Sequence, residues 1–250
     1  FVFQGTNSVK SIGQKAFADD PKLEKFEIPS SVTDISQGAF VNTPNLKTVT
    51  FKQPASIKVI GEGAFGNSGI TAITLPASVT TIKQQAFDNC KELVTIKIPK
   101  NVTKIETGAF NFTEKMKKFE VEAGNANYSA VDGILCSNNK DTLVTFPAGK
   151  ADSRYTSLPY FKAIGPYAFY SSKKITNVTI PRSVTEIKTR AFALCDNLTS
   201  LSFMGTDNVP TLTAGILFSS PDPKKVTIYV RKKWYEASPN EATVRNYRNT

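Results

Sequence analysis

The sequence predicts a solenoid of α/β class, a chain wound into successive short coils that is rich in strand and poor in helix. Two observations predict it. A ten-residue segment ending in Ala-Phe recurs along the chain, and a second, strand-like segment recurs between its copies. Self-similarity at a fixed period marks repeat architectures, so the period determines the fold before any single residue does.

The Ala-Phe segment returns at a nearly constant spacing. It reads SVTDISQGAF at 31–40, SVTTIKQQAF at 78–87, NVTKIETGAF at 101–110 and SVTEIKTRAF at 183–192. The phenylalanines that end the seven copies are Phe17, Phe40, Phe65, Phe87, Phe110, Phe169 and Phe192. Apart from one gap of 59 residues, they lie 22 to 25 residues apart. This unit falls in the range of leucine-rich repeats, so we expect a right-handed leucine-rich repeat solenoid.

Each unit also contains a strand-like segment between two Ala-Phe copies. These segments are LEKFEIP (23–29), LKTVTF (46–51), ITAITLP (70–76), LVTIKIP (93–99) and ITNVTIP (175–181). Apolar and variable residues alternate in them, which predicts a half-buried strand. Proline lacks a backbone N–H and therefore marks the end of the strand. Stacked at about 4.8 Å per coil, the strands would form one continuous parallel sheet.

The Ala-Phe segment is predicted to be architectural. In the copy at 31–40, we expect Val32 and Ile35 to point inward from a second extended piece, and residues 36–40 to make the turn. Phe40 is expected to stack on its equivalents in the neighbouring coils, as a ladder of aromatic rings through the core. The alternative is an aromatic stripe that binds a ligand.

The 59-residue gap between Phe110 and Phe169 is long enough for one further coil and an insert. Residues 125–149 contain the turn former Asp132-Gly133 and two apolar segments, GILC and TLVTF, on either side of the turn-forming run SNNKD. We expect a protruding β-hairpin there and an extra coil that ends near Pro159. The alternative is a disordered loop.

The complete unit resembles a known family. Its pattern, L-x-x-I-x-I-P-x-S-V-T-x-I-x-x-x-A-F-x-x-C, is similar to the BspA-type leucine-rich repeats of bacterial cell-surface proteins and some protozoan parasites. The resemblance covers about residues 9–200, includes the insert at 125–149, and extends to a terminal strand and short helix at 226–237. It implies an extracellular or surface-anchored protein that takes part in adhesion or binds host, partner-cell or extracellular-matrix proteins. It implies no catalytic site.

We expect residues 1–250 to form a single domain, because each coil needs its neighbours to bury its apolar face. Within it, the insert would span about residues 120–160 and a C-terminal cap about 205–250. The sequence has no apolar run long enough to cross a membrane, so we expect no membrane insertion of this segment.

The sequence offers no recognisable catalytic or cofactor chemistry. It has no histidine, which excludes Ser-His-Asp and Cys-His catalysis and histidine metal sites. Carboxylates such as Asp19, Asp20, Glu120 and Glu122 occupy ordinary repeat or loop positions rather than a recognisable glycosidase pair. No phosphate-binding Gly-x-x-x-x-Gly-Lys loop occurs. We therefore predict that the chain is not an enzyme and uses neither metal nor cofactor.

Cys90 and Cys195 are predicted not to form a disulfide with each other. Cys90 and Cys195 occupy the same repeat position, three residues after the phenylalanine. If the long gap contributes one coil, they lie four coils or roughly 19 Å apart at strand spacing, too far for a disulfide. Cys136 lies in the insert, where we expect it to be exposed.

The chain is basic, with 31 Lys and Arg against 21 Asp and Glu. The excess is spread along the sequence, and no helix-turn-helix or basic–aromatic RNA motif accompanies it, so nucleic acid is not favoured as a partner. An anionic glycan remains an alternative partner for the basic surface.

Binding is predicted on the outward face of the strands, which is generally the binding side of leucine-rich solenoids. The outward side chains are short and polar, which suits a weak, repetitive contact with an extended partner. The candidate ligand-binding residues are Lys25, Thr48, Thr50, Thr95, Lys97, Lys118, Asn177 and Thr179. The alternative is a passive structural spacer. A patch that departs from the repeat pattern would favour a binding protein, whereas a spacer should be uniform.

Overall fold

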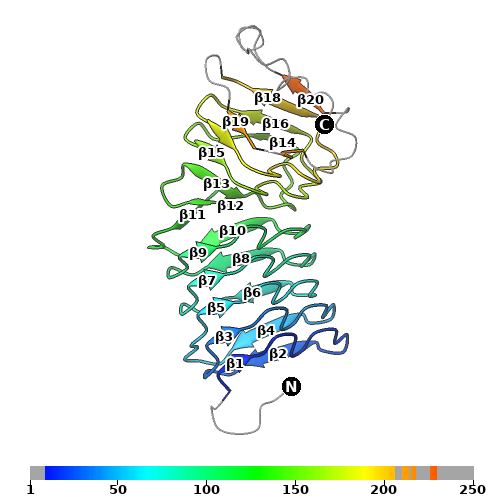
Figure 1. Ribbon diagram of the computed structural model, residues 1–250, viewed down its shortest axis with the longest axis vertical. Helices are drawn as coiled ribbons and strands as arrows, with labels where there is room; N and C mark the ends of the chain where they lie inside the picture. The colour runs from blue at the N-terminus through cyan, green and yellow to red at the C-terminus, as the bar shows by residue number, and fades with distance from the viewer. Residues whose placement is uncertain (1–8, 206–209, 214, 218–225, 230–250) are drawn as a thin grey trace.

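The computed structural model describes residues 9–205, 210–213, 215–217 and 226–229. Figure 1 shows a column of stacked coils that runs from the N-terminal coils at one end to the C-terminal coils at the other. A regular coil contributes a main strand of three or four residues and a short strand of two residues. The fold is thus a β-solenoid.

The main strands lie along one side of the column. They are β2 (Lys25–Ile28), β4 (Thr48–Phe51), β6 (Ala72–Thr74), β8 (Thr95–Ile98), β10 (Lys118–Val121), β14 (Arg154–Thr156), β16 (Asn177–Ile180), β18 (Ser200–Phe203) and β20 (Thr227–Tyr229). They pair in parallel, but in three sections rather than in the single sheet that the repeats predict: β2–β4, β6–β8–β10 and β14–β16–β18–β20. The break after β10 falls at the insert.

The short strands form a second row beside the main strands (Figure 1). They are β1 (Ser11–Ile12), β3 (Asp34–Ile35), β5 (Val59–Ile60), β7 (Thr81–Ile82), β9 (Lys104–Ile105), β15 (Ala163–Ile164), β17 (Glu186–Ile187) and β19 (Thr211–Leu212). The first five make one parallel sheet, and the last three belong to a second sheet that begins with the insert strands β11 (Tyr128–Val131), β12 (Ile134–Ser137) and β13 (Thr142–Thr145). Both rows are therefore interrupted at the insert.

The α/β class expected from the sequence is not confirmed, because the described residues contain no helix. Tight turns make the return path of each coil instead. Around Phe87, for example, Gln85 has a φ of 56° and Asn89 a φ of 55°. A left-handed residue cannot continue a right-handed helix, so two such positions in one turn exclude a helix there. The short helix expected within 226–237 falls on residues outside those described.

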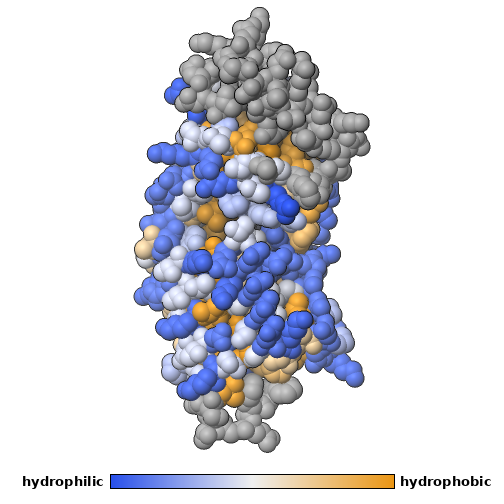
Figure 2. All heavy atoms as spheres, viewed as in Figure 1, coloured by the Kyte–Doolittle hydropathy of each residue, from blue (hydrophilic) through white to orange (hydrophobic). Residues whose placement is uncertain are grey.

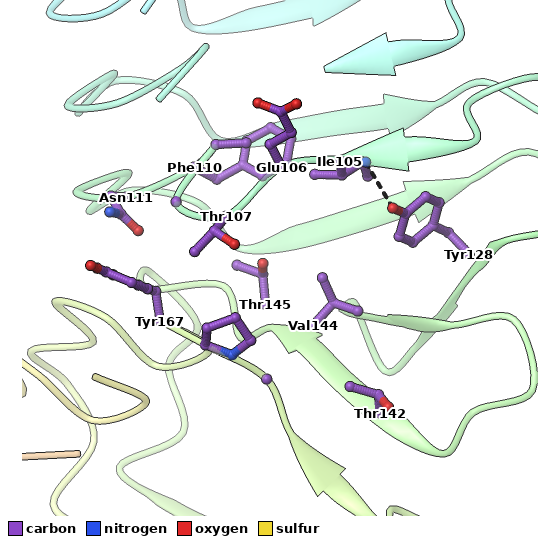
Figure 3. A pocket seen from close by; sticks show the side chains of 14 residues that line it. Ile105, Glu106, Thr107, Phe110, Asn111, Tyr128, Thr142, Val144, Thr145 and Tyr167 are labelled. Carbon is purple, nitrogen blue, oxygen red and sulfur yellow. Dashed lines mark hydrogen bonds between the residues drawn. The ribbon is translucent and has the colours of Figure 1, made fainter. Parts of the chain in front are cut away.

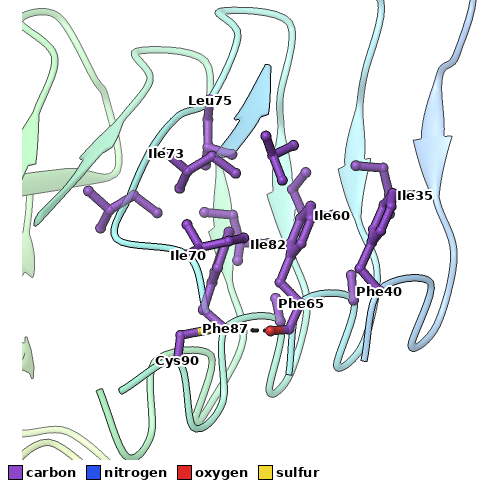
Figure 4. Close-up of a cluster of buried hydrophobic side chains, with 14 of the residues drawn as sticks. Ile35, Phe40, Ile60, Phe65, Ile70, Ile73, Leu75, Ile82, Phe87 and Cys90 are labelled. Carbon is purple, nitrogen blue, oxygen red and sulfur yellow. Dashed lines mark hydrogen bonds between the residues drawn. The ribbon is translucent and has the colours of Figure 1, made fainter. Parts of the chain in front are cut away.

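The core has the ladder of aromatic rings predicted from the repeats. Successive rings from Phe17 to Phe110 stack with centroids 5.3, 5.3, 5.4 and 5.6 Å apart. Figure 4 shows three of these rings lying side by side, each beside the isoleucine of its own short strand. Val32, Ile35 and Phe40 have no exposed surface. The Ala-Phe segment is architectural, as predicted.

Backbone hydrogen bonds join the turns of neighbouring coils, and we call this series the turn ladder. The phenylalanine N–H of one coil donates to the alanine C=O of the next, as from Phe65 to Ala86 (2.8 Å) and from Phe87 to Ala109 (2.8 Å). Phe146 donates in the same way to Ala168 (2.7 Å). Phe146 therefore occupies the phenylalanine position of the extra coil that the long gap predicts.

Side chains add further bonds between coils. The threonine of the Val-Thr pair bonds a carbonyl of the preceding coil, as from Thr80 Oγ1 to Lys58 O (3.1 Å). Asparagines at a left-handed turn position make a second row, in which Asn42 donates to Asp19 (2.7 Å) and Asn67 donates to Asn42 (2.7 Å). Asparagine adopts this conformation more readily than most residues, so one residue type serves both the turn and the row.

The insert does not protrude from the solenoid as the sequence suggests. Strand β12 pairs antiparallel with β11 and with β13, and β13 then pairs in parallel with β15. Ile134, Leu135 and Cys136 on β12 are all fully buried. Leu135 belongs to the N-terminal hydrophobic core, whereas Ile134 and Cys136 belong to the C-terminal one. Strand β12 thus lies between two cores and buries both its faces.

All three cysteines are free, so the predicted absence of a Cys90–Cys195 disulfide is confirmed. The prediction that Cys136 is exposed is wrong, because β12 is buried on both faces. Burial raises the pKa of each of the three thiols to about 12. They are therefore protonated near neutral pH and behave as small core residues.

Candidate functional site

The structure places the predicted binding residues on the outward side of the main strands, but not on one continuous sheet. Lys25 lies beside Thr48 and Thr50 lies beside Glu27 on the β2–β4 pair. Thr95 lies between Ala72 and Lys118, and Lys97 between Thr74 and Glu120, on the second section. Asn177 and Thr179 pair with Ser200 and Ser202 beyond the insert. Figure 2 shows mostly hydrophilic residues on the visible face of the N-terminal coils.

These residues differ in how available they are for a partner. Lys25, Thr48, Thr50 and Lys97 are exposed. Thr95 is only partly exposed, and Asn177 Nδ2 already donates to Ser200 Oγ (2.5 Å). Lys118 Nζ lies 2.5 Å from Glu120 Oε1, and this contact holds the pKa of Glu120 below its usual value. The exposed face before the insert is therefore the better candidate.

A second candidate site lies at the insert, and sequence reasoning missed it. A pocket of about 190 Å³ opens between the turn that ends at Phe110 and the turns of the next two coils. We call it the junction pocket (Figure 3). Its lining residues are Ile105, Glu106, Thr107, Gly108, Ala109, Phe110, Asn111, Tyr128, Thr142, Val144, Thr145, Gly165, Pro166 and Tyr167.

The turn ladder is interrupted at this pocket. In the preceding coil, Phe87 donates to Ala109 and Asn89 donates to Asn111. The equivalent N–H groups of Phe110 and Phe112 have no hydrogen-bond partner among the described residues. The physical cause is the insert. Strand β13, which precedes the next phenylalanine, pairs with β12 at Thr145–Leu135 instead of lying against the turn of Phe110.

Of the polar side chains at the pocket, Tyr128 makes a contact between coils and Glu106 pairs within its own coil. The hydroxyl of Tyr128 accepts a hydrogen bond from Ile105 N at 2.7 Å (Figure 3), and partial burial raises the pKa of Tyr128. The carboxylate of Glu106 is bound by Lys104 Nζ at 2.8 Å, which lowers the pKa of Glu106. Tyr128 is therefore neutral and Glu106 is charged near neutral pH. Neither is arranged as a nucleophile with a base.

Tyr167 lines the junction pocket and belongs to a cluster of three partly buried aromatic residues, which we call the aromatic rim: Phe112, Tyr167 and Tyr170. The rings of Phe112 and Tyr170 meet edge to face at 5.1 Å, and those of Tyr167 and Tyr170 lie 5.2 Å apart. Arg190 Nη1 donates to the hydroxyl of Tyr167 at 3.0 Å. The rim joins residues from both sides of the insert.

A comparison of repeat positions would have found the rim in the sequence. The position two residues before the phenylalanine has positive φ in every one of these turns. It is Gly38, Gly63 and Gly108 in three coils and Lys15, Gln85 and Arg190 in three others, and it is aromatic, Tyr167 with a φ of 57°, at the rim. A bulky side chain in this conformation is uncommon and strained. Phe112 occupies a position that is asparagine in three earlier coils. The rim is therefore a patch that departs from the repeat pattern.

Asp88 lies one coil before the pocket and gives a pH-dependent prediction. Partial burial raises its pKa to about 6 from 3.8, and its Oδ1 is buried without a partner among the described residues. The folded protein thus holds this proton more tightly than the unfolded chain, so the stability that the group contributes is complete below pH 4 and is lost as the pH rises through 6.

We expect Asp88→Asn to leave the unfolding free energy nearly unchanged at pH 4 and to raise it at pH 7. The gain should be roughly 1 kcal/mol, less than the full pKa shift implies, because the side chain is partly exposed to solvent. Thermal unfolding of both proteins at the two pH values measures it. An equal difference at pH 4 and pH 7 would contradict the assignment.

The comparisons with known proteins agree with this architecture. The family model of the BspA-type leucine-rich repeat region matches residues 10–130 and 155–231 in six copies. The chain belongs to the BspA-type leucine-rich repeat family. The match leaves out residues 131–154, which hold β12 and β13, so the junction pocket lies where the BspA-type repeats are interrupted. No curated protein matches the sequence.

Three solved structures, two of them of leucine-rich repeat proteins, have a similar fold. A leucine-rich repeat protein from Eubacterium ventriosum is 27% identical with a TM-score of 0.68, over 78% of this chain and 58% of that one. The pneumococcal vaccine antigen PcpA is 24% identical with a TM-score of 0.64, over 88% and 68%. A leucine-rich repeat protein from Bacteroides ovatus is 20% identical with a TM-score of 0.50, over 79% and 60%. This BspA-type chain thus spans little more than half of the first of these structures.

Two further findings concern the described residues alone. None of their segments forms a helix that is long and apolar enough to span a membrane. They also contain no group of three or more cysteine or carboxylate side chains placed to hold a metal ion.

Proposed function

We propose that this chain is a non-catalytic protein-binding module of a secreted or cell-surface protein, where it takes part in adhesion. Its partner would be a protein of the extracellular matrix or of a host or partner-cell surface. The observation that carries the proposal is the registered outward face of β6, β8 and β10, where five of the six outward residues are polar or charged and recur at strand spacing across adjacent coils. Such a face offers the same contact repeatedly to an extended partner.

The junction pocket favours a binding module over a passive spacer. A spacer needs only uniform coils, yet this chain has a cluster of three aromatic rings, the aromatic rim, at one position of the column. Partly exposed aromatic side chains are enriched where proteins bind partners. The relatives are consistent with binding rather than catalysis, because their names describe a leucine-rich repeat protein and a vaccine antigen and no enzyme.

The proposal is tested by a charge reversal on the outward face. Binding of the chain to immobilised extracellular-matrix proteins and anionic glycans is first measured by surface plasmon resonance. Lys97→Glu combined with Lys118→Glu is then expected to weaken binding of the protein partner about tenfold or more, because both lysines lie on the proposed contact face. Circular dichroism checks that the variant is folded.

A matched control separates a local contact from overall charge. Lys58→Glu with Lys83→Glu changes the net charge equally at exposed positions next to the short strands. A protein bound to the outward face should tolerate this control. Equal losses in both double variants would instead indicate an anionic glycan attracted by the whole basic surface. Unchanged binding in the face variant would move the contact away from the main strands.

A further inference from the structure

The N–H groups of Phe110 and Phe112 lack the hydrogen bonds to the next coil that the equivalent N–H groups make in the preceding coil. Elsewhere in the described chain, the phenylalanine of each turn donates its N–H to the next coil, as do Phe17, Phe40, Phe65, Phe87, Phe146 and Phe169. Phe110 does not, although it is a buried residue with 5% exposure. Buried backbone N–H groups without a partner are rare in folded proteins, so this position points to an acceptor supplied from outside the described chain.

The two N–H donors lie two residues apart in the sequence, and this separation indicates which acceptor groups fit them. In the preceding coil, the N–H groups of Phe87 and Asn89 meet the carbonyls of Ala109 and Asn111 at 2.8 and 2.9 Å. Those acceptors are two residues apart on one backbone. The donors at Phe110 and Phe112 have the same separation in sequence, and therefore suit two carbonyl groups on alternate residues of a polypeptide.

We propose that the junction pocket binds a short extended segment of a partner polypeptide, whose main-chain carbonyls accept hydrogen bonds from Phe110 N and Phe112 N. The segment takes the place of the missing neighbouring turn. This inference rests on the proposed protein-binding function and adds a second contact, separate from the outward face of the main strands.

The size and surroundings of the pocket suit this occupant. Its volume of about 190 Å³ equals that of roughly six water molecules, enough for a short piece of main chain. Tyr167 lines the pocket, and with the other rings of the aromatic rim it offers ring surfaces to an apolar side chain of the same segment. The charged Glu106 lines the pocket, which disfavours an anion and leaves neutral carbonyl groups as the better acceptors.

The test begins with hydrogen exchange in the free protein. We expect the amides of Phe110 and Phe112 to exchange faster than those of Phe87 and Asn89, whose hydrogen bonds are complete. Linear peptides are then selected from a phage-displayed library on the whole chain. Selected peptides should slow exchange at residues 108–112 and leave exchange in β6, β8 and β10 unchanged.

A pair of variants locates the peptide. Thr107 lines the pocket three residues before Phe110, and Gln84 has the same position before Phe87, where the turn ladder is complete. Both side chains are exposed. Thr107→Trp should fill the mouth of the pocket and weaken peptide binding about tenfold or more, whereas Gln84→Trp should leave it unchanged.

A measurement on the ligand does not depend on how the variants fold. Replacing single peptide amides by esters weakens the carbonyl as an acceptor, so two replacements on alternate residues should each lower the affinity for the unaltered chain. The inference would be overturned if the peptide binds Thr107→Trp and Gln84→Trp with equal affinity, whether that affinity is unchanged or reduced. It would also be overturned if the ester replacements leave the affinity for the unaltered chain unchanged. A library that yields no peptide would overturn it as well. A matrix protein that binds the outward face would still support the proposed function in each of these cases.

Discussion

Phe65→Ala is expected to lower the free energy of unfolding by about 3 to 5 kcal/mol. Phe65 has no exposed surface, and its ring stacks between Phe40 and Phe87 at 5.3 and 5.4 Å. The neighbouring coils are joined by backbone hydrogen bonds and cannot collapse into the space that the ring leaves. The substitution therefore loses apolar burial and leaves a cavity in the ladder of rings.

Equilibrium denaturation by urea, followed by circular dichroism, measures this loss. Phe112→Ala is the matched control, because Phe112 is also a turn phenylalanine but lies in the partly exposed aromatic rim. We expect the control to cost clearly less, roughly 1 kcal/mol. Similar losses for the two substitutions would mean that the stacked rings contribute no more than surface contacts do.

Leu135→Asp is expected to destabilise the protein by more than about 3 kcal/mol. Leu135 is fully buried on β12 and packs in the N-terminal core, while its neighbours Ile134 and Cys136 pack in the C-terminal core. A carboxyl group there loses the apolar contacts of leucine and must remain desolvated or protonated. Because β12 joins the two cores, we also expect unfolding to separate into two transitions.

The readout is the number and position of the transitions in urea, followed by both circular dichroism and hydrogen exchange. Leu135→Met serves as the control, since it nearly conserves volume and should cost less than about 1.5 kcal/mol with a single transition retained. If Leu135→Asp behaves like Leu135→Met, then β12 does not join the two cores and the insert is a peripheral element.

The regular coils could be predicted from the sequence because each of their features is local and repeated. The alternation in Ile96-Lys97-Ile98 predicts a strand with two inward residues, and both isoleucines are buried on β8. The same logic predicts Phe40 in the core and an extra coil within the long gap, which Phe146 completes. Hydrophobic period and repeat length suffice for such features.

The insert could not be predicted in the same way. The apolar pattern of residues 134–136 shows that they form a buried strand, but not which cores they enter. A strand with three successive buried residues fits a protruding hairpin poorly, and the structure shows it between two cores. The expected helix is another such case, because left-handed residues such as Gln85 and Asn89 are not marked by residue type alone.

The sequence by itself determined the repeat unit, the inward residues, the family and the absence of a histidine-based site. Only the tertiary structure decided where the turn ladder is interrupted and which side chains border the gap. The physical reason is distance along the chain. A coil is specified by contacts between residues about 23 positions apart. The residue types that make these contacts recur in every coil, so the sequence shows them as a period. The junction pocket depends on one insert that displaces the turns of Phe110 and Phe146 from each other. Because the insert occurs once, no repeating pattern in the sequence marks the contacts that it changes.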